Sequence, residues 1–259
     1  LIESTDGLRL TAGTALSPEV KISAYLEYND VLGTTIVDRV WLQTLIVGDR
    51  RWDRIAYRFS GTRDRFTLEF PRRILRDSLQ MLLDGLPPEV IQEDGLLHVL
   101  IPDEDTEGGE HCLDMWYEVP GVAEESEPMG FEFPTLPEDV WVRRTYWQLV
   151  LPETRHLIAS PDEIVQEYRW KWNGWFFLRV PVMEQSELEA WCGASPSSPP
   201  PSPSNRYLFS SLGSVEHCEV LTSQRTHIVL ICSGIALALG LAGVYYPKAR
   251  RPGVLLCGV

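Results

Sequence analysis

The chain alternates polar and apolar residues over much of its length, as β-strands with one buried face do. The alternation is clearest at residues 54–59 (Arg-Ile-Ala-Tyr-Arg-Phe) and 65–70 (Arg-Phe-Thr-Leu-Glu-Phe). Other predicted strands, rich in β-branched and aromatic residues, are residues 20–28, 36–47, 96–101, 112–119, 140–151 and 168–180. Asn-Asp, Gly-Asp, Ser-Gly, Asp-Gly and Asn-Gly pairs between them predict turns. The sequence therefore predicts an all-β fold.

Helical patterns are few and short. One begins at Ser160, which precedes a proline and an acidic pair, and a second has a capping box formed by Ser186 and Glu189 and ends near Gly193. Residues 72–83 place leucines at positions that fit either a helix or a strand, so periodicity does not decide between them.

Similar segments recur along the chain. Asp-Gly, a leucine-rich strand, a loop and a tyrosine-containing strand occur at residues 6–28 and again at 94–118, with a weaker echo at 173–181. Modules of this size with many short strands suit antiparallel β-sandwiches. We therefore predict tandem antiparallel β-sandwich-like modules: residues 1–30 as the tail of a preceding module, 31–120 as a sandwich and 135–192 as a second, smaller module.

Near the end of the chain the apolar pattern becomes continuous. Residues 226–247 are predicted to form a transmembrane helix, because no charge interrupts the run from Ile228 to Pro247 and about 20 helical residues cross the roughly 30 Å hydrocarbon core. The basic residues that follow, Lys248, Arg250 and Arg251, predict a cytoplasmic location after the span and an extracytoplasmic N-terminal region.

The segments that flank these elements complete the predicted organisation. Residues 193–206 are rich in proline and serine and are predicted to be an extended spacer, followed by a juxtamembrane segment at 207–225. The chain begins at Leu1 without a signal segment, and an apolar run resumes after Pro252. We expect a signal and further modules to precede this sequence, and residues 248–259 to be a cytoplasmic turn and the start of a second span.

This order of segments resembles a known kind of protein. Predicted β-modules are followed by Tyr-Leu-Phe-Ser-Ser at 207–211, by Ile-Val-Leu at 228–230, and by Arg-Arg-Pro-Gly-Val-Leu-Leu at 250–256. The arrangement is similar to the C-terminal region of large uncharacterised bacterial membrane-anchored envelope proteins with β-sandwich modules. The resemblance covers most of the chain and implies no activity and no catalytic residues.

Composition and charge narrow the partners. Hydrophobic residues make up 44% of the chain and include nine Trp, which is ample material for a core. All 37 acidic residues precede the predicted span, and the net charge is −14, so we expect no nucleic-acid partner. Three cysteines, Cys112, Cys192 and Cys218, also precede the span and allow one disulfide with one thiol left over. The sequence does not choose the pair.

Candidate catalytic chemistry is scarce. The sequence has no nucleophile elbow, zinc-protease helix, phosphate-binding loop or dinucleotide fingerprint, and its five histidines are scattered. We therefore predict that the chain is not an enzyme and has no cofactor, with calcium as the one candidate exception.

The candidate calcium site lies in the acidic region between Pro102 and Asp139. Its four ligand residues, spaced as in a calcium-binding loop, are Asp103, Asp105, Glu107 and Asp114. Predicted strands flank the loop, whereas helices flank the loop of an EF-hand. The alternative is an acidic hairpin loop without a bound ion.

An aromatic hairpin provides the second candidate binding site. Its four residues, which would stack on sugar rings if they were exposed, are Tyr168, Trp170, Trp172 and Trp175. Alternate positions put the first three on one face of a strand. Because Arg169 and Lys171 fall on the opposite face, we predict that the aromatic face is buried as core.

Together these features predict a membrane-anchored, extracytoplasmic β-rich protein with a structural, adhesive or protein-interaction role. Its expected partners are the lipid bilayer and other envelope proteins or glycans. The alternative is a carbohydrate-binding envelope module that uses the aromatic hairpin as its platform.

Overall fold

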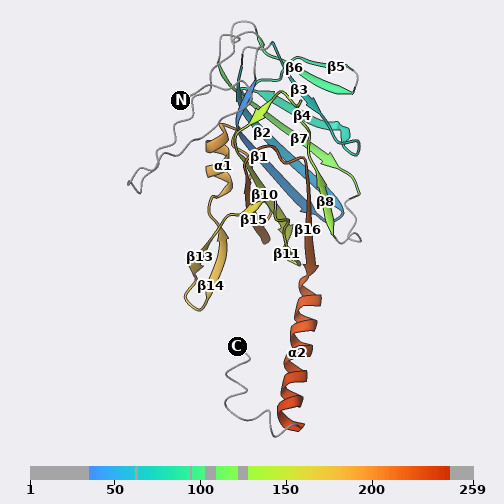
Figure 1. Cartoon of the computed structure of the whole chain (residues 1–259), viewed down its shortest axis with the longest axis vertical. Helices are drawn as coiled ribbons and strands as arrows, with labels where there is room; N and C mark the ends of the chain where they lie inside the picture. Colours follow the sequence, from blue (N-terminus) through green and yellow to red (C-terminus); the bar gives the residue numbers. More distant parts are fainter. Residues whose placement is uncertain (1–34, 62–63, 94, 103–108, 122–127, 246–259) are drawn as a thin grey trace, which may run out of the picture. The chain divides into compact units, whose positions relative to one another are not determined.

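The computed structural model describes residues 35–61, 64–93, 95–102, 109–121 and 128–245, which fold into β-strands with two helices (Figure 1). The elements up to the acidic region are β1 (Ile36–Val47), β2 (Arg50–Ser60), β3 (Arg65–Glu69), β4 (Leu75–Leu83), β5 (Val90–Glu93), β6 (Leu96–Leu100) and β7 (Glu110–Val119). Those that follow are β8 (Met129–Glu132), β9 (Trp141–Val142), β10 (Thr145–Pro152), β11 (Arg155–Ala159), β12 (Val165–Gln166), β13 (Tyr168–Trp172), β14 (Phe177–Pro181), α1 (Gln185–Cys192), β15 (Ser204–Ser211), β16 (His217–Gln224) and α2 (Arg225–Tyr245).

An eight-stranded sheet forms the centre of the fold. Its strand order is β12-β15-β10-β1-β2-β7-β4, and β9 pairs with β1 beside this path. β1 and β2 are an antiparallel hairpin, whereas β1 and β10 run parallel with Val40 opposite Thr145. Two three-stranded sheets, β11-β16-β8 and β3-β6-β5, and the separate hairpin β13-β14 complete the strands described.

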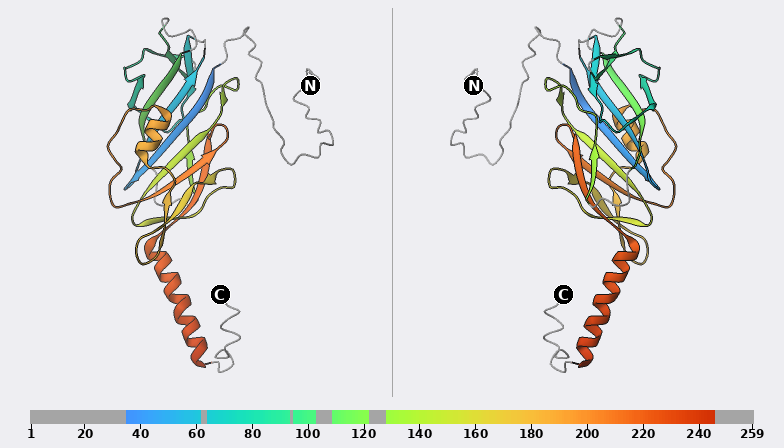
Figure 2. Two further views of the ribbon diagram at one scale, coloured as in Figure 1. Left: turned by 90° about the vertical axis from the view of Figure 1, so that its left-hand side faces the viewer. Right: turned by 90° about the vertical axis from the view of Figure 1, so that its right-hand side faces the viewer.

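One face of the large sheet packs against the two three-stranded sheets, as Figure 2 shows from two sides. The buried cluster between them joins Leu42 and Trp147 of the large sheet with Phe66 of β3, Val99 of β6 and Phe131 of β8. Trp147 makes ring contacts with Phe131, and its indole Nε1 donates a hydrogen bond of 3.1 Å to Thr44 Oγ1 on β1. The large sheet and the two three-stranded sheets therefore form a β-sandwich with one continuous core between them.

The opposite face of the large sheet is covered by α1. Trp41 lies between Val40 and Leu42 in β1, yet it packs on the other face of the sheet with Leu188 and Cys192 of α1. Successive side chains of a strand point to opposite faces, so β1 supplies both layers. This explains why β1 has apolar side chains at the adjacent positions 40–42 and 45–47.

The predicted division into tandem modules is wrong for the residues described. Strands from 31–120 and from 135–192 lie in one sheet, because β1 pairs directly with β10, and they share one core. The echo at 94–118 spans two different sheets, whereas the echo at 173–181 lies in an isolated hairpin. Residues 1–30 lie outside the described residues.

The short helical patterns have different outcomes. The helix predicted to end near Gly193 is confirmed as α1. Its capping box is formed by Glu184 and Glu187, and not by Ser186 and Glu189 as predicted. Gly193 ends it with φ 79°, a conformation that suits glycine. The pattern that begins at Ser160 forms a turn and not a helix. The undecided stretch 72–83 contains strand β4.

The segments predicted as a spacer and a juxtamembrane region belong to the sandwich. Residues 193–206 lead from α1 into β15, which pairs along its full length with β10, and 207–225 contain the rest of β15 and all of β16. The predicted spacer therefore does not separate the sandwich from a membrane. Tertiary hydrogen bonds described below hold this proline-rich segment on the sheet.

The second helix begins where the sandwich ends. α2 follows β16 without an intervening residue, and the backbone N–H of Arg225 donates to the carbonyl of Thr154, at 2.7 Å, in the turn between β10 and β11. Residues 225–242 have a mean hydropathy of 1.7, and none of them is buried. α2 is thus long and apolar enough to cross a membrane. Residues 248–259, with the predicted second span, lie outside the described residues.

Candidate functional site

The aromatic hairpin β13–β14 is exposed on both faces, so the prediction that its aromatic face is buried as core is wrong. Tyr168, Trp170 and Trp172 are 40%, 62% and 54% exposed, and Trp175 at the turn is 87% exposed. The hairpin pairs only with itself, and no other described strand or helix forms a layer over it. Nothing in the sequence of an isolated hairpin reveals that a second layer is missing.

Local hydrogen bonds hold the turn of the hairpin in shape. The side-chain Oδ1 of Asn173 accepts hydrogen bonds of 3.0 Å from the backbone N–H groups of Trp175 and Phe176. Gly174 has φ 102°, a value that side chains strongly disfavour. Trp172 and Phe177 face each other across the strands with ring centroids 5.0 Å apart, so the aromatic groups lie together near the tip.

The predicted calcium ligands are not brought together among the residues described. Asp103, Asp105 and Glu107 lie outside the described residues. Asp114 lies on β7 with 2% of its surface exposed, and both of its carboxylate oxygens bind the guanidinium of Arg54, at 3.0 and 2.7 Å. A carboxylate that is paired in this way is not available to a calcium ion.

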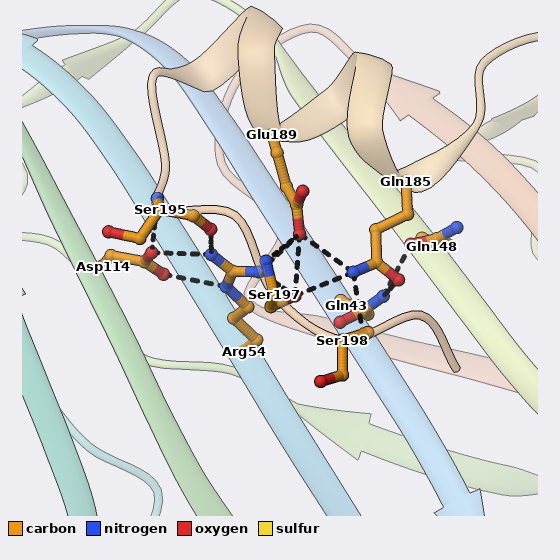
Figure 3. Close-up of polar contacts among 9 residues, drawn as sticks. All are labelled: Gln43, Arg54, Asp114, Gln148, Gln185, Glu189, Ser195, Ser197 and Ser198. Atoms are coloured by element: carbon orange, nitrogen blue, oxygen red, sulfur yellow. Dashed lines mark hydrogen bonds and ion pairs between the residues drawn. The ribbon is translucent and has the colours of Figure 1, made fainter. Parts of the chain in front are cut away.

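Arg54 is the centre of a buried polar cluster between the sheet, α1 and the proline-rich segment, which the sequence did not suggest (Figure 3). Besides Asp114, its guanidinium donates to Glu189 Oε1 at 2.9 Å and to Ser197 Oγ at 2.6 Å. It also donates to the backbone carbonyl of Ser195. All five N–H donors of the guanidinium are thereby used.

The rest of the cluster extends along α1 to the neighbouring strands. Gln185 donates to Glu189 at 2.9 Å and to Ser197 Oγ at 2.7 Å, and it accepts a hydrogen bond of 3.0 Å from Gln43 on β1. Gln43 also donates to Gln148 on β10 at 2.9 Å. The cluster therefore links three parts of the chain that are far apart in sequence.

Two tryptophans enclose the arginine. The Arg54 guanidinium carbon lies 4.8 Å from the centre of the Trp41 ring and 4.9 Å from that of the Trp116 ring. An arginine between aromatic faces is stabilised by cation–π attraction, most strongly when it is shielded from water. The arrangement fastens α1 and the proline-rich segment to the sheet.

The pH dependence of this cluster follows from Glu189. Burial raises the pKa of Glu189, but hydrogen bonds from Gln185, Ser197 and Arg54 outweigh it and hold the pKa below its ordinary value. A lowered folded-state pKa adds stability that is fully present above the ordinary glutamate value of about 4.3 and is lost as the pH falls through the folded value.

We therefore expect Glu189→Gln to lower the free energy of unfolding at neutral pH and to differ less from the wild type in acid. Urea unfolding of both proteins at a series of pH values measures this difference. Asp162→Asn, at an exposed turn, is the control and should not differ from the wild type at any pH. A Glu189→Gln difference that stays constant into acid would contradict the assigned role.

The structure also selects a cysteine pair that the sequence left open. Cys112 on β7 packs against the same cluster as Cys192 at the end of α1, whereas Cys218 lies in the core on the other face of the sheet. A hydrogen bond with Cys112, together with burial, raises the pKa of Cys192 well above its ordinary value. Cys112 and Cys192 are therefore neighbours on the face of the sheet that α1 covers.

We expect oxidised glutathione to join Cys112 to Cys192, with two equivalents of reduced glutathione released for each disulfide formed. Thiolate is the attacking species, so the raised pKa of Cys192 should make the reaction slow at neutral pH and faster as the pH rises. Peptide mass spectrometry identifies the pair. In the Cys112→Ser control the disulfide should be lost, and a Cys192–Cys218 disulfide in the wild type would contradict the assigned neighbours.

A surface cavity of about 370 Å³ is lined by Trp52, Ser78, Gln80, Met81, Leu82 and Trp116. Among the described residues, no group of three or more His, Cys, Asp or Glu side chains is arranged to hold a metal ion.

No known protein family and no curated protein matches the chain by sequence. Solved structures that are similar include a two-domain M1 zinc metallopeptidase bound to L-tryptophan, with 8% identity and a TM-score of 0.40. The M1 zinc metallopeptidase from Deinococcus radiodurans has 7% identity and a TM-score of 0.38. Each match covers 73% of this chain, which spans less than half of the matched structures (43% and 42%). Similarity this low supports no assignment of function.

Proposed function

We propose that this chain is a membrane-anchored, extracytoplasmic β-sandwich protein with a structural, adhesive or protein-interaction role in a bacterial envelope. The observation that carries the proposal is the direct passage from β16 into α2, an exposed apolar helix of membrane-spanning length. Because Arg225 at the junction is hydrogen-bonded to Thr154 of the sandwich, the body of the protein is held close to the start of the span.

Charge supports the orientation. The basic residues after the span, Lys248, Arg250 and Arg251, favour the cytoplasmic side. Protease access tests the orientation. The chain is expressed in bacteria with a secretory signal at its N-terminus, and the bacteria are converted to spheroplasts. External protease should then digest the sandwich, and an epitope tag after Val259 should stay protected. A protected sandwich with a digested tag would contradict the orientation.

The contacts of the polar cluster in the sandwich support the interaction role. The polar cluster around Arg54 is occupied by contacts that hold the fold together, and its charged members Arg54, Asp114 and Glu189 are buried away from solvent. The role assigned to the sandwich is therefore to present surfaces and not to transform a substrate. Turnover of any small-molecule or peptide substrate by the purified chain would overturn this part of the proposal.

Carbohydrate recognition is the second candidate function. The observation that favours it is the exposure of Trp170 and Trp172, since exposed aromatic rings can stack on sugars. Glycan-array binding that is lost in Trp170→Ala and Trp172→Ala, and retained in Trp141→Ala, would support this candidate. Trp141 is a matched control because it is 52% exposed and lies on β9, away from the hairpin. The absence of glycan binding by the wild-type chain would count against it.

A further inference from the structure

The hairpin β13–β14 has a composition unlike the rest of the chain. Residues 168–181 contain three basic residues, Arg169, Lys171 and Arg179, and no acidic residue, in a protein of net charge −14. Seven of its large apolar side chains are at least 40% exposed: Tyr168, Trp170, Trp172, Trp175, Phe176, Phe177 and Leu178. A basic, aromatic projection of this kind needs a partner that is apolar and negatively charged.

Strand pairing gives the direction in which the chain enters the hairpin. β10 runs towards the turn at Thr154, which binds the first residue of α2, and β15 is antiparallel to β10. β12 is antiparallel to β15 and therefore runs in the same direction as β10. Glu167 continues β12 into β13, with its N–H donating to the carbonyl of Leu208 at 2.8 Å. The hairpin thus extends towards the end of the sandwich from which α2 leaves, as Figure 1 shows.

The length of the hairpin matches the distance to that end. The distance from Leu208 to the end of the sandwich can be counted along two strands. Leu208 is four residues from Ser204 on β15, and Ser204 pairs with Pro152 on β10. Thr154 is two residues beyond Pro152, which makes six residues in all. At about 3.3 Å per residue this path is roughly 20 Å. From Glu167 to Asn173 at the turn is again six residues, or roughly 20 Å. The turn with Trp175 therefore reaches the level at which α2 begins.

We propose that the tip of the hairpin lies in the headgroup region of the bilayer that α2 crosses. Trp and Tyr are enriched at membrane interfaces, where an amphipathic ring has both apolar and polar surroundings. Anionic lipid headgroups attract lysine and arginine close to the surface. The hairpin supplies both kinds of residue at the depth of Arg225 and His227, which precede the uninterrupted apolar part of α2.

The proposal rests on the proposed function, because it requires α2 to span the membrane. It adds a second point of attachment to that anchor. A helix and a hairpin tip together define which face of the sandwich is turned away from the membrane. The same aromatic groups are then occupied by lipid and are not presented to glycans.

Quenching by brominated lipid tests the location of the tip. The full chain is reconstituted in vesicles of phosphatidylcholine and phosphatidylglycerol, in which part of the phosphatidylcholine is brominated near the glycerol end of its acyl chains. The triple variant Trp170→Ala, Trp172→Ala, Trp175→Ala is compared with wild type. The difference in tryptophan fluorescence between the wild type and the triple variant is the contribution of these three residues. We expect brominated lipid to quench most of this difference, because the three tryptophans contact the lipid.

The control is Trp141→Ala, because Trp141 pairs beside Ile36 at the opposite end of the sheet. Fluorescence lost in this variant should not be sensitive to brominated lipid. The proposal is overturned if the fluorescence lost in the triple variant is also insensitive to brominated lipid while the wild type and the triple variant both resist alkaline extraction. It is also overturned if soluble glycans, and not lipid, change that fluorescence. Release of the wild-type chain by alkaline extraction would instead show that α2 does not span, and so would overturn the proposed function itself.

Discussion

Arg54→Ala is expected to lower the free energy of unfolding by about 3–5 kcal/mol, the range found when one partner of a buried ion pair is removed. The alanine would leave Asp114 and Glu189, both buried, without their shared cation. It would also remove the cation–π contacts with Trp41 and Trp116. Urea unfolding of the full chain in detergent measures the loss.

Two further variants show whether the loss comes from burial of unpaired charge. Arg65→Ala removes an arginine whose partner Asp64 is exposed, at 3.4 Å, and should cost no more than about 1 kcal/mol. Replacing the whole ion cluster by Arg54→Met, Asp114→Leu and Glu189→Leu should restore much of the stability lost in Arg54→Ala, because no buried charge then lacks a partner. Equal losses in Arg54→Ala and Arg65→Ala would contradict the structural role of the cluster.

Trp147→Ala is expected to cost a similar amount, about 3–5 kcal/mol, through the cavity left by a large buried ring. Trp147 on β10 packs against Phe131, Phe133 and Phe209, which come from β8, the segment after it and β15. Hydrogen exchange locates the effect. We expect protection to fall in β1 and β2 as well as in β10 and β15, because these strands share a core.

The matched control is again Trp141→Ala, which removes an exposed ring and should stay within about 0.5 kcal/mol of wild type. If Trp147→Ala reduced protection only within residues 135–192, the two halves of the sandwich would be independent, contrary to the parallel pairing of β1 with β10.

The strands with clear alternation or many β-branched residues were predictable, because the period of two is a local signal, whereas β15 and β16 lie in segments predicted as a spacer and a juxtamembrane region. The hairpin β1–β2 and the short helix α1 before Gly193 lie close to their predicted ranges. The parallel pairing of β1 with β10 was not predictable in this way, since it joins residues separated by most of the sandwich sequence. The similar segments along the sequence therefore suggested separate repeated modules, whereas in the structure β1 and β10 belong to one sheet.

The site predictions failed where the outcome depended on distant contacts. Composition marked the proline-rich segment as a spacer, but Ser195 and Ser197 bind Arg54 and Glu189, which no local pattern reveals. Charges on the opposite face of β13 suggested that its tryptophans were buried. They are exposed, because burial requires a second layer and not only an apolar face.

The central claim is that α2 anchors the sandwich in a membrane, and alkaline extraction of reconstituted vesicles tests it most directly. The double variant Ile235→Lys, Leu239→Lys puts two charges into α2, each costing about 2.5–3.5 kcal/mol near the centre of a span. The control, Leu86→Lys with Leu212→Lys, places the same residues at exposed positions of the sandwich. Wild type and control are predicted to stay with the lipid while the α2 variant is released; release of the wild type, or retention of all three, would contradict the claim.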